Sequence, residues 1–330
     1  MTAEQLVGAS RDGGRGPAVV ALGGGHGLSA SLSALRLMSD RITAVVTVAD
    51  DGGSSGRLRD ELGVLPPGDL RMALAALCDE SDWGRLWRDV LQHRFASDGA
   101  LDRHAVGNLL IVALWEILGD PVAGLDWVGR LLGARGRVLP MAAVPLRIEA
   151  DVVGTDGRTR LVEGQSHVAV ATGRVAQVRL DPRQPPACPE ALEAVRQADL
   201  VVLGPGSWYT SVLPHLLVPE LHEALATSRA RTIVTLNLQP ERIGETLGMP
   251  VTDHLAALAE LAPDLQVEAV VVDPGAVADV DLLADRCEVM GARMLMRQLG
   301  RGDGTAQHDP IRLAAAYRDV VDGCYGDVHP

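Results

Sequence analysis

A run of four glycines and one histidine, Gly23-Gly24-Gly25-His26-Gly27, separates an apolar segment at 18–22 from an apolar-periodic segment at 28–38. Glycines between a strand and a helix let a phosphate approach backbone N–H groups at the positive end of the helix dipole. The alternative is a tight turn that needs positive φ. Four glycines in five residues exceed what a turn requires, so we predict a phosphate or nucleotide contact. His26 could bind that phosphate or cap the helix.

A second loop, rich in acids and hydroxyls, follows the apolar segment 42–48. Its predicted ligand-binding residues are Asp50, Asp51, Gly52, Gly53, Ser54, Ser55 and Arg57. An acid at this place in a dinucleotide-binding fold often accepts a hydrogen bond from a ribose hydroxyl. Paired carboxylates can instead hold Mg²⁺. The third alternative is structural: aspartates can accept hydrogen bonds from the backbone N–H groups of their own turn. The hydroxyls, flexible amides and arginine suit anion recognition. We therefore expect the loop to serve binding.

Two further polar positions open predicted helices. The rigid turn at 66–71 contains Gly68 and predicts Asp69 as an N-cap, with Arg71 in the first helical turn. A cation there opposes the helix dipole, so Arg71 should meet an anion unless it is a surface residue paired with Glu61. Asn108 opens the next predicted helix, as an N-cap or as a ligand contact.

The glycine turn recurs in the second half of the chain, after the apolar segment 200–203. The predicted contacts there are Gly204, Pro205, Gly206, Ser207 and Thr210, with Asn237 at the end of a further strand. Two such turns at the carboxyl ends of parallel strands can face one crevice, so we predict a shared anion or sugar clamp. No nucleophile, base and orienting group can be placed together, and no catalytic residue or metal ligand is assigned. Helix capping is the favoured interpretation of Asp253 and His254.

The elements that must position these loops alternate between strand and helix. This alternation predicts an α/β fold, with a Rossmann-like, doubly wound, mostly parallel sheet in a single nucleotide-binding domain over residues 17–330, or two interleaved lobes. Residues 69–132 are predicted to be mostly helical. Between about 137 and 180 polar and apolar residues alternate, which predicts a β-rich insertion. Residues 1–16 lack an apolar signal core and are predicted to form a disordered leader.

The amino-acid composition disfavours several classes of function. The 30 basic residues are all arginine and stand against 43 acidic ones, a net charge of −13. The acidic excess disfavours a nucleic-acid partner, and the absence of lysine excludes Schiff-base chemistry and a lysine-bearing phosphate loop. No apolar run reaches 18 residues, so no membrane span is expected. The four widely spaced cysteines are expected to be free thiols of a cytoplasmic protein.

The motifs together resemble the bacterial gluconeogenesis factor family over about residues 17–320. The resemblance rests on Ala-Leu-Gly-Gly-Gly-His-Gly-Leu-Ser, Val-Thr-Val-Ala-Asp-Asp-Gly-Gly-Ser-Ser-Gly-Arg-Leu-Arg, Leu-Pro-Pro-Gly-Asp-Leu-Arg, Gly-Asn-Leu-Leu and Gly-Pro-Gly-Ser-Trp-Tyr-Thr-Ser. That family belongs to the superfamily of 2-phospho-L-lactate transferase, an enzyme of coenzyme F420 assembly. The resemblance implies a Rossmann-like fold, a cytoplasmic location, binding of uridine-diphosphate sugars such as UDP-N-acetylglucosamine, and a link to cell shape and wall synthesis during gluconeogenic growth.

Two positions depart from the pattern of that family. His26 stands where the family has threonine, and Met249 stands where the family has an aromatic residue that would contact a nucleotide. A thioether offers polarizable contact but no hydroxyl. We therefore expect an altered affinity or base preference.

Three hypotheses follow. In the first, the protein is a regulatory protein that binds a nucleotide sugar: the glycine turns hold the diphosphate and Asp50 or Asp51 meets a ribose or sugar hydroxyl. Its expected partners are the small molecule, a second copy in a homodimer, and regulators of cell-wall synthesis. In the second, it is a transferase with Mg²⁺ on Asp50 and Asp51. The third, a dinucleotide-dependent oxidoreductase, is disfavoured because Leu28 occupies the third glycine position of the fingerprint.

Overall fold

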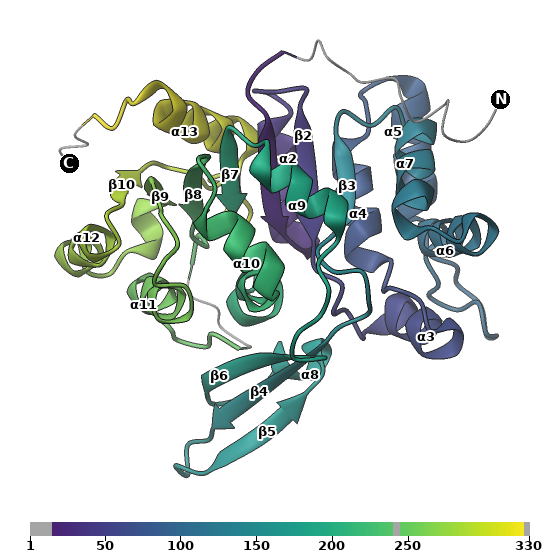
Figure 1. Cartoon of the computed structure of the whole chain (residues 1–330), viewed down its shortest axis with the longest axis horizontal. Helices are drawn as coiled ribbons and strands as arrows, with labels where there is room; N and C mark the ends of the chain where they lie inside the picture. Colours follow the sequence, from purple (N-terminus) through teal and green to yellow (C-terminus); the bar gives the residue numbers. More distant parts are fainter. Residues whose placement is uncertain (1–14, 240–244, 327–330) are drawn as a thin grey trace.

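A seven-stranded sheet with helices on both faces forms the centre of the computed structural model, which describes residues 15–239 and 245–326 (Figure 1). Its strands are β1 (Val19–Gly23), β2 (Ile42–Val46), β3 (Arg137–Pro140), β7 (Leu200–Leu203), β8 (Arg231–Thr235), β9 (Ala269–Val272) and β10 (Arg293–Met296). A smaller antiparallel sheet projects from it and contains β4 (Arg147–Val153), β5 (Thr159–Glu163) and β6 (Arg174–Asp181).

The order of the large sheet is β3-β2-β1-β7-β8-β9-β10, and every pairing in it is parallel. From β1 the chain moves outward in one direction, and from β7 it moves outward in the other. The gap between the carboxyl ends of β1 and β7 is therefore the topological switch point, where open α/β sheets bind ligands. This arrangement confirms the predicted doubly wound, mostly parallel α/β fold.

The helices cover the sheet in two layers. On one face α2 (Gly25–Leu35) packs against both α4 (Gly68–Leu77) and α13 (Pro310–Asp322), while α9 (Pro189–Arg196) and α10 (Pro219–Ala226) pair on the other. The remaining helices are α3 (Gly53–Leu62), α5 (Asp82–Gln92), α6 (Val106–Leu118), α7 (Pro121–Leu131), α8 (Gln165–Val168), α11 (Val251–Leu261) and α12 (Val280–Val289). The central strands β1 and β7 are buried along their whole length, as the parallel arrangement requires.

The predicted β-rich insertion begins later than residue 137. Its first segment, β3, pairs in parallel with β2 and belongs to the large sheet, because Val138 and Leu139 are consecutive buried residues and not an alternating pair. True alternation of buried and exposed residues starts in β4. The antiparallel insertion therefore spans residues 147–181.

Two helices begin at residues that differ from the prediction. The glycine run itself opens α2 at Gly25, and α4 begins at Gly68 after Pro67, so Asp69 lies in the first turn and is not the N-cap. The predicted leader falls outside the described residues except for Arg15 and Gly16. No helix in the described parts of the chain combines the length and apolar character that crossing a membrane requires.

Candidate functional site

The two glycine turns meet at the switch point. The first begins α2, where Gly24 is the N-cap residue and the Leu28 N–H donates to its carbonyl. The second follows β7. A Cβ on Gly27 would collide with the carbonyl oxygen of Pro205, so the turns are in direct contact and only glycine fits.

A cleft of about 760 Å³ opens beside both turns. The predicted site residues that line it are Gly24, Gly25, His26, Gly27, Asp69, Pro205, Gly206, Ser207 and Asn237. Sequence reasoning missed other lining residues, among them Gln239, Arg301 and His308, because the segments that carry them lie far from either turn in the sequence. His26 is exposed on the first turn of α2 and is not its N-cap, because Gly24 occupies that position.

The second turn is held rigidly from both sides. The Gly206 N–H donates to Asn237 Oδ1 at 3.0 Å, and Asn237 Nδ2 donates to the Gly206 carbonyl at 3.0 Å. Behind it, Ser31 Oγ donates to the Gly204 carbonyl at 2.8 Å and lies 3.0 Å from the Tyr317 hydroxyl. Gly206 has φ +148°, a conformation that favours glycine. The turn is thus preorganised, which reduces the entropy cost of binding.

Asp69 lines the cleft, and Asp50 lies near enough for its charge to act on Asp69. A Cβ on Gly24 would strike the Asp69 carboxylate, and one on Gly68 would strike Asp50 and Ser55, so both carboxyls lie against glycine backbone. Burial, with the nearby charge of Asp50, raises the pKa of Asp69 to about 7, although the Gly25 N–H donates to it. Burial also raises the pKa of Asp50, against hydrogen bonds from the Gly52 N–H and Ser55.

Asp51 is directed away from this pair. Its Oδ1 accepts a hydrogen bond of 2.8 Å from the N–H of Ser166, in α8 of the insertion. Asp51 lines the separate hollow beside Arg57, and Asp69 is the carboxyl that lines the cleft.

Arg71, Asn108 and Ser54 belong to a buried network behind the cleft. Arg71 is only 3% exposed, so the surface pairing with Glu61 is wrong. Its Nε donates to Asn108 Oδ1 at 2.9 Å and its Nη1 donates to Gln92 Oε1, while Asn108 Nδ2 donates to Ser54 Oγ at 3.0 Å. Burial lowers the pKa of Arg71 to about 10, and the charges of Asp69 and Asp50 oppose that shift. Asn108 therefore lies within α6, where its side chain is hydrogen-bonded to Arg71, and it is not the N-cap.

Two other predicted residues lie away from the cleft. Arg57 donates to the carbonyl of Asp102 at 2.6 Å and lines a separate, more open hollow with Asp51 and Gly53. Thr210 is buried, and its N–H donates to Glu245 Oε1 at 3.3 Å. His254 is also buried, with its ring stacked 5.2 Å from that of Trp208, so helix capping is wrong for this residue.

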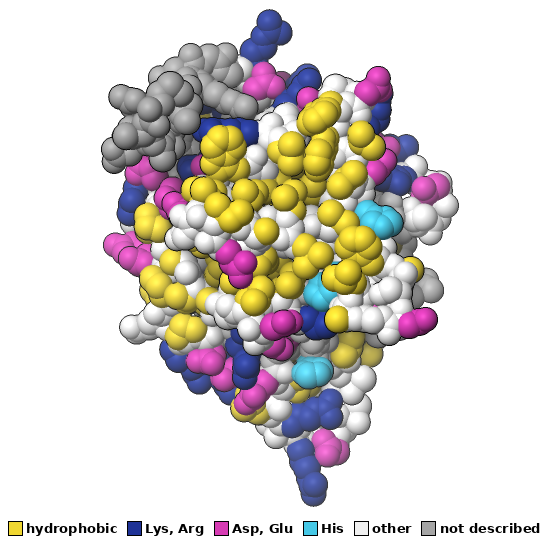
Figure 2. Space-filling model, turned by 90° about the vertical axis from the view of Figure 1, so that its right-hand side faces the viewer, with side chains coloured by type: hydrophobic (Ala, Val, Ile, Leu, Met, Phe, Trp, Pro, Cys, Tyr) yellow, Lys and Arg dark blue, Asp and Glu magenta, His cyan; other side chains and the backbone are white. Residues whose placement is uncertain are grey.

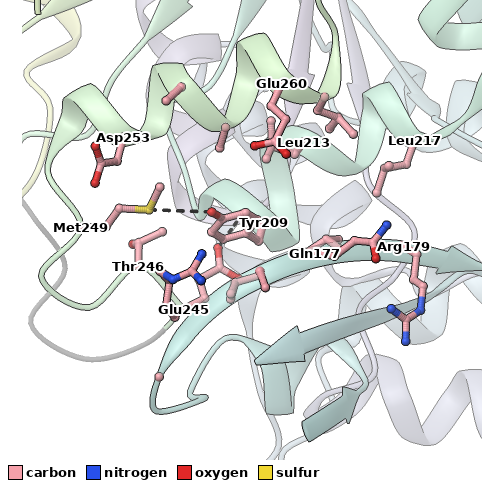
Figure 3. Close-up of a pocket in the computed structure, with 18 of the residues that line it drawn as sticks. Gln177, Arg179, Tyr209, Leu213, Leu217, Glu245, Thr246, Met249, Asp253 and Glu260 are labelled. Atoms are coloured by element: carbon pink, nitrogen blue, oxygen red, sulfur yellow. Dashed lines mark hydrogen bonds between the residues drawn. The ribbon is translucent and has the colours of Figure 1, made fainter. Parts of the chain in front are cut away.

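A second cavity, of about 790 Å³, lies between β6 and α11 (Figure 3). Tyr209, two residues after Ser207, points into it, and its hydroxyl lies 3.9 Å from Met249 Sδ. Glu245 Oε1 accepts a hydrogen bond of 2.8 Å from the Tyr209 N–H and so fixes the start of this segment. The sequence analysis named Met249 but did not name Tyr209 or Glu245 as site residues. Tyr209 follows the second glycine turn closely and Glu245 stands four residues before Met249, and these positions were the available signal.

Comparison with known proteins identifies the family. Residues 19–299 match the family model described as 2-phospho-L-lactate transferase CofD. A Mycobacterium tuberculosis protein named "Putative gluconeogenesis factor" is 52% identical over 317 residues, covering 94% of this chain and 91% of that protein. The chain belongs to the CofD-like gluconeogenesis factor family.

Other members of the family are similar to this chain in sequence and in structure. The Bacillus subtilis "Gluconeogenesis factor" is 36% identical and covers 93% of this chain and 99% of its own. The crystal structure of a UPF0052-family protein from Bacillus halodurans superposes with a TM-score of 0.82 at 34% identity, over 92% of this chain and 98% of that one. The family's architecture therefore extends over nearly the whole chain.

Proposed function

We propose that this protein binds a nucleotide sugar of the UDP-N-acetylglucosamine type in the cleft at the switch point. The observation that carries the proposal is the contact between Gly27 and Pro205, which brings two glycine turns to one cleft. Backbone N–H groups at the start of a helix attract phosphate oxygens. Two such turns suit a diphosphate, which presents two phosphate groups a few ångströms apart.

Hydroxyl and ring contacts for the rest of the ligand lie close by. Ser207, Ser211 and Asn237 line the same cleft and can bond sugar or ribose hydroxyls. Tyr209 lies between Ser207 and Ser211 in the chain but faces the second cavity, where its ring and the Met249 thioether offer a surface for a base. We propose that the nucleoside end of the ligand extends toward this cavity.

The proposed role is regulatory: a cytoplasmic protein that reports nucleotide-sugar supply to regulators of cell-wall synthesis during gluconeogenic growth.

A specific observation favours a second candidate, a Mg²⁺-dependent transferase. Asp50 and Asp69 are carboxyls enclosed beside the phosphate-binding turns, and Mg²⁺ in phosphate sites is held by one or two carboxylates together with the phosphates. Such an ion would neutralise phosphate charge in the transferase reaction.

Calorimetric titration tests the binding proposal. Wild type should bind UDP-N-acetylglucosamine, and Gly206→Val should weaken binding by at least about tenfold, because a branched side chain strains the turn and blocks close approach of the ligand to its backbone. Gly291→Val is the matched control, since Gly291 also has positive φ (+68°) but lies in open space after α12. Equal losses in both variants would point to general destabilisation, and wild-type affinity in Gly206→Val would place the ligand elsewhere.

A turnover assay separates the two candidates. Protein mixed with UDP-N-acetylglucosamine and Mg²⁺ should leave the nucleotide sugar intact over hours if the role is regulatory. Release of UDP or UMP in proportion to protein, and its loss in Asp50→Asn, would favour the transferase instead.

A further inference from the structure

The small antiparallel sheet has two edges, and they face different surroundings. Its strand order is β5-β4-β6, so β5 and β6 each leave one backbone edge without a strand partner. The β5 edge is on the outside: residues 159–161 and 163 are exposed, and Figure 2 shows charged side chains at the lower end of the molecule, where this sheet projects. The β6 edge instead lines the second cavity, opposite α11 (Figure 3).

The backbone of β6 borders that cavity along most of the strand. Every residue from Gly173 to Leu180 lines it, although the side chains of a strand alternate between its two faces. A lining run without alternation indicates that the strand lies edge-on to the cavity. In the described parts of the chain, no hydrogen bond reaches this edge, since β6 pairs with β4 alone.

The register of the sheet identifies which backbone groups point outward. The Gly164 N–H donates to the Ile148 carbonyl at 2.7 Å, so Ile148 in β4 faces β5 and the next residue, Glu149, faces β6. Arg179 lies opposite Glu149 and is therefore directed toward β4. Because this direction alternates along an antiparallel strand, both neighbours of Arg179 present their N–H and C=O groups to the cavity.

We propose that the second cavity docks an extended segment of a partner protein, with alternating apolar and basic residues, which adds to β6 as a fourth strand. N–H and C=O groups that recur at strand spacing are matched by another extended backbone. Leu213 and Leu217 of the 3-10 helix η2 (Leu213–Leu217) and Ala257 of α11 line the cavity, and apolar side chains of the added segment can pack on them. The β5 edge has no such wall opposite it.

The size of the cavity selects a single chain. Its volume of about 790 Å³ lies within the range of pockets that enclose small ligands, so it accommodates one short extended segment and not the packed edge of a second folded sheet. The inference does not rest on nucleotide-sugar binding. The proposed nucleoside surface, Tyr209 and Met249, lies at the other end of the cavity from Arg179 (Figure 3).

The charges around the cavity favour a basic segment. Two of the three arginines that line it, Arg179 and Arg183, form ion pairs with Glu149. On the opposite wall Asp253 and Glu260 are exposed, and no ion pair joins either of them to another described residue. The net charge of −13 adds long-range attraction for a basic partner.

Fluorescence anisotropy with the labelled hexapeptide acetyl-Val-Lys-Val-Lys-Val-Lys-amide tests the proposal. Wild type should bind it saturably. Val178→Pro should weaken binding at least about fivefold, the equivalent of one lost hydrogen bond, because proline removes an outward N–H and leaves the ladder to β4 intact. Leu161→Pro is the matched control: Val162 pairs with Ala150, so the Leu161 N–H lies on the outer edge of β5, and peptide affinity should not change. The acidic peptide with Glu in place of Lys should bind at least about tenfold more weakly.

Amide hydrogen exchange of the wild type gives a readout that needs no variant. Saturating basic peptide should slow exchange at Val178 and Leu180 at least about tenfold, because their N–H groups gain partners in the added strand. Exchange at Arg179, which is already directed toward β4, should stay unchanged.

Three results would overturn the proposal. The first is the absence of saturable binding of the basic peptide up to about 1 mM. The second is unchanged exchange at Val178 and Leu180 in peptide-saturated wild type, or equal peptide affinity of folded Val178→Pro and Leu161→Pro. The third is slowed exchange at Val178 and Leu180 when the protein alone is concentrated, since the edge would then pair with a second copy of the chain.

Discussion

Asp69 gives the cleft a titrating group near neutral pH. Its pKa of about 7 arises from burial and the charge of Asp50, and it lies where a diphosphate would approach α2. Without Mg²⁺, ionised Asp69 repels the ligand, so we expect affinity for UDP-N-acetylglucosamine to fall about tenfold from pH 6 to pH 8. In Asp69→Asn this dependence should flatten, because the amide keeps the shape and an acceptor for the Gly25 N–H but carries no charge. Titrations at both pH values check this.

Exposed Asp40→Asn is the control and should retain the wild-type pH profile. If Mg²⁺ bridges Asp69 and the phosphates, its addition should reverse the slope, because the ion needs the ionised carboxylate. A pH-independent affinity in wild type, with and without Mg²⁺, would contradict the placement of Asp69 at the phosphates.

The same pKa affects folding. The folded state keeps a proton on Asp69 that the unfolded chain releases near pH 4. Its contribution to the free energy of unfolding is therefore full below about pH 4 and is lost as the pH rises toward 7. Urea unfolding should accordingly show Asp69→Asn more stable relative to wild type at pH 8 than at pH 5. An unchanged difference between the two pH values would mean that Asp69 does not titrate in the folded state near neutrality.

The partners of individual residues could be predicted only in part. Strand-end glycines and acids identified the switch-point loops, because parallel strands bring their carboxyl ends to one edge. The pairing of Asp50 with Asp69, and the network of Arg71 with Asn108 and Ser54, could not be predicted. These contacts depend on how α4 and α6 pack, and no local spacing encodes that packing.

At the scale of elements, Asp51 connects the small sheet to the loop that follows β2. Its bond to the Ser166 N–H holds α8 beside the loop. We expect Asp51→Ala to speed amide hydrogen exchange over residues 164–168 and to lower the free energy of unfolding by about 1 kcal/mol, the usual loss for such a hydrogen bond. Asp156→Ala is the control, because Asp156 accepts only from Arg158 within its own turn. Equal exchange in both variants would show that Asp51 does not anchor the insertion.

Elements were predictable where the local pattern matched the final environment. The apolar runs of β1, β2, β7 and β8 indicated buried parallel strands. In contrast, β10 reads Arg-Met-Leu-Met and has no β-branched residue, so no strand was predicted there. The start of the insertion was predicted too early because one short apolar segment fits either sheet until its pairing partner is known.

The whole molecule carries a strong negative charge, and its proposed ligand is an anion. At long range a net charge of −13 repels a diphosphate, and added salt screens that repulsion. At short range the helix N-terminus and the glycine N–H groups act within the cleft, where salt has less effect. We therefore expect the association rate of UDP-N-acetylglucosamine to rise about twofold between 20 and 200 mM salt, measured by stopped flow, with little change in the dissociation rate. Uncharged N-acetylglucosamine, where its weak binding is measurable, should show no such rise. A steep fall in affinity with salt would instead mean that arginine side chains, such as Arg301 in the cleft, hold the phosphates by charge and that backbone groups contribute little.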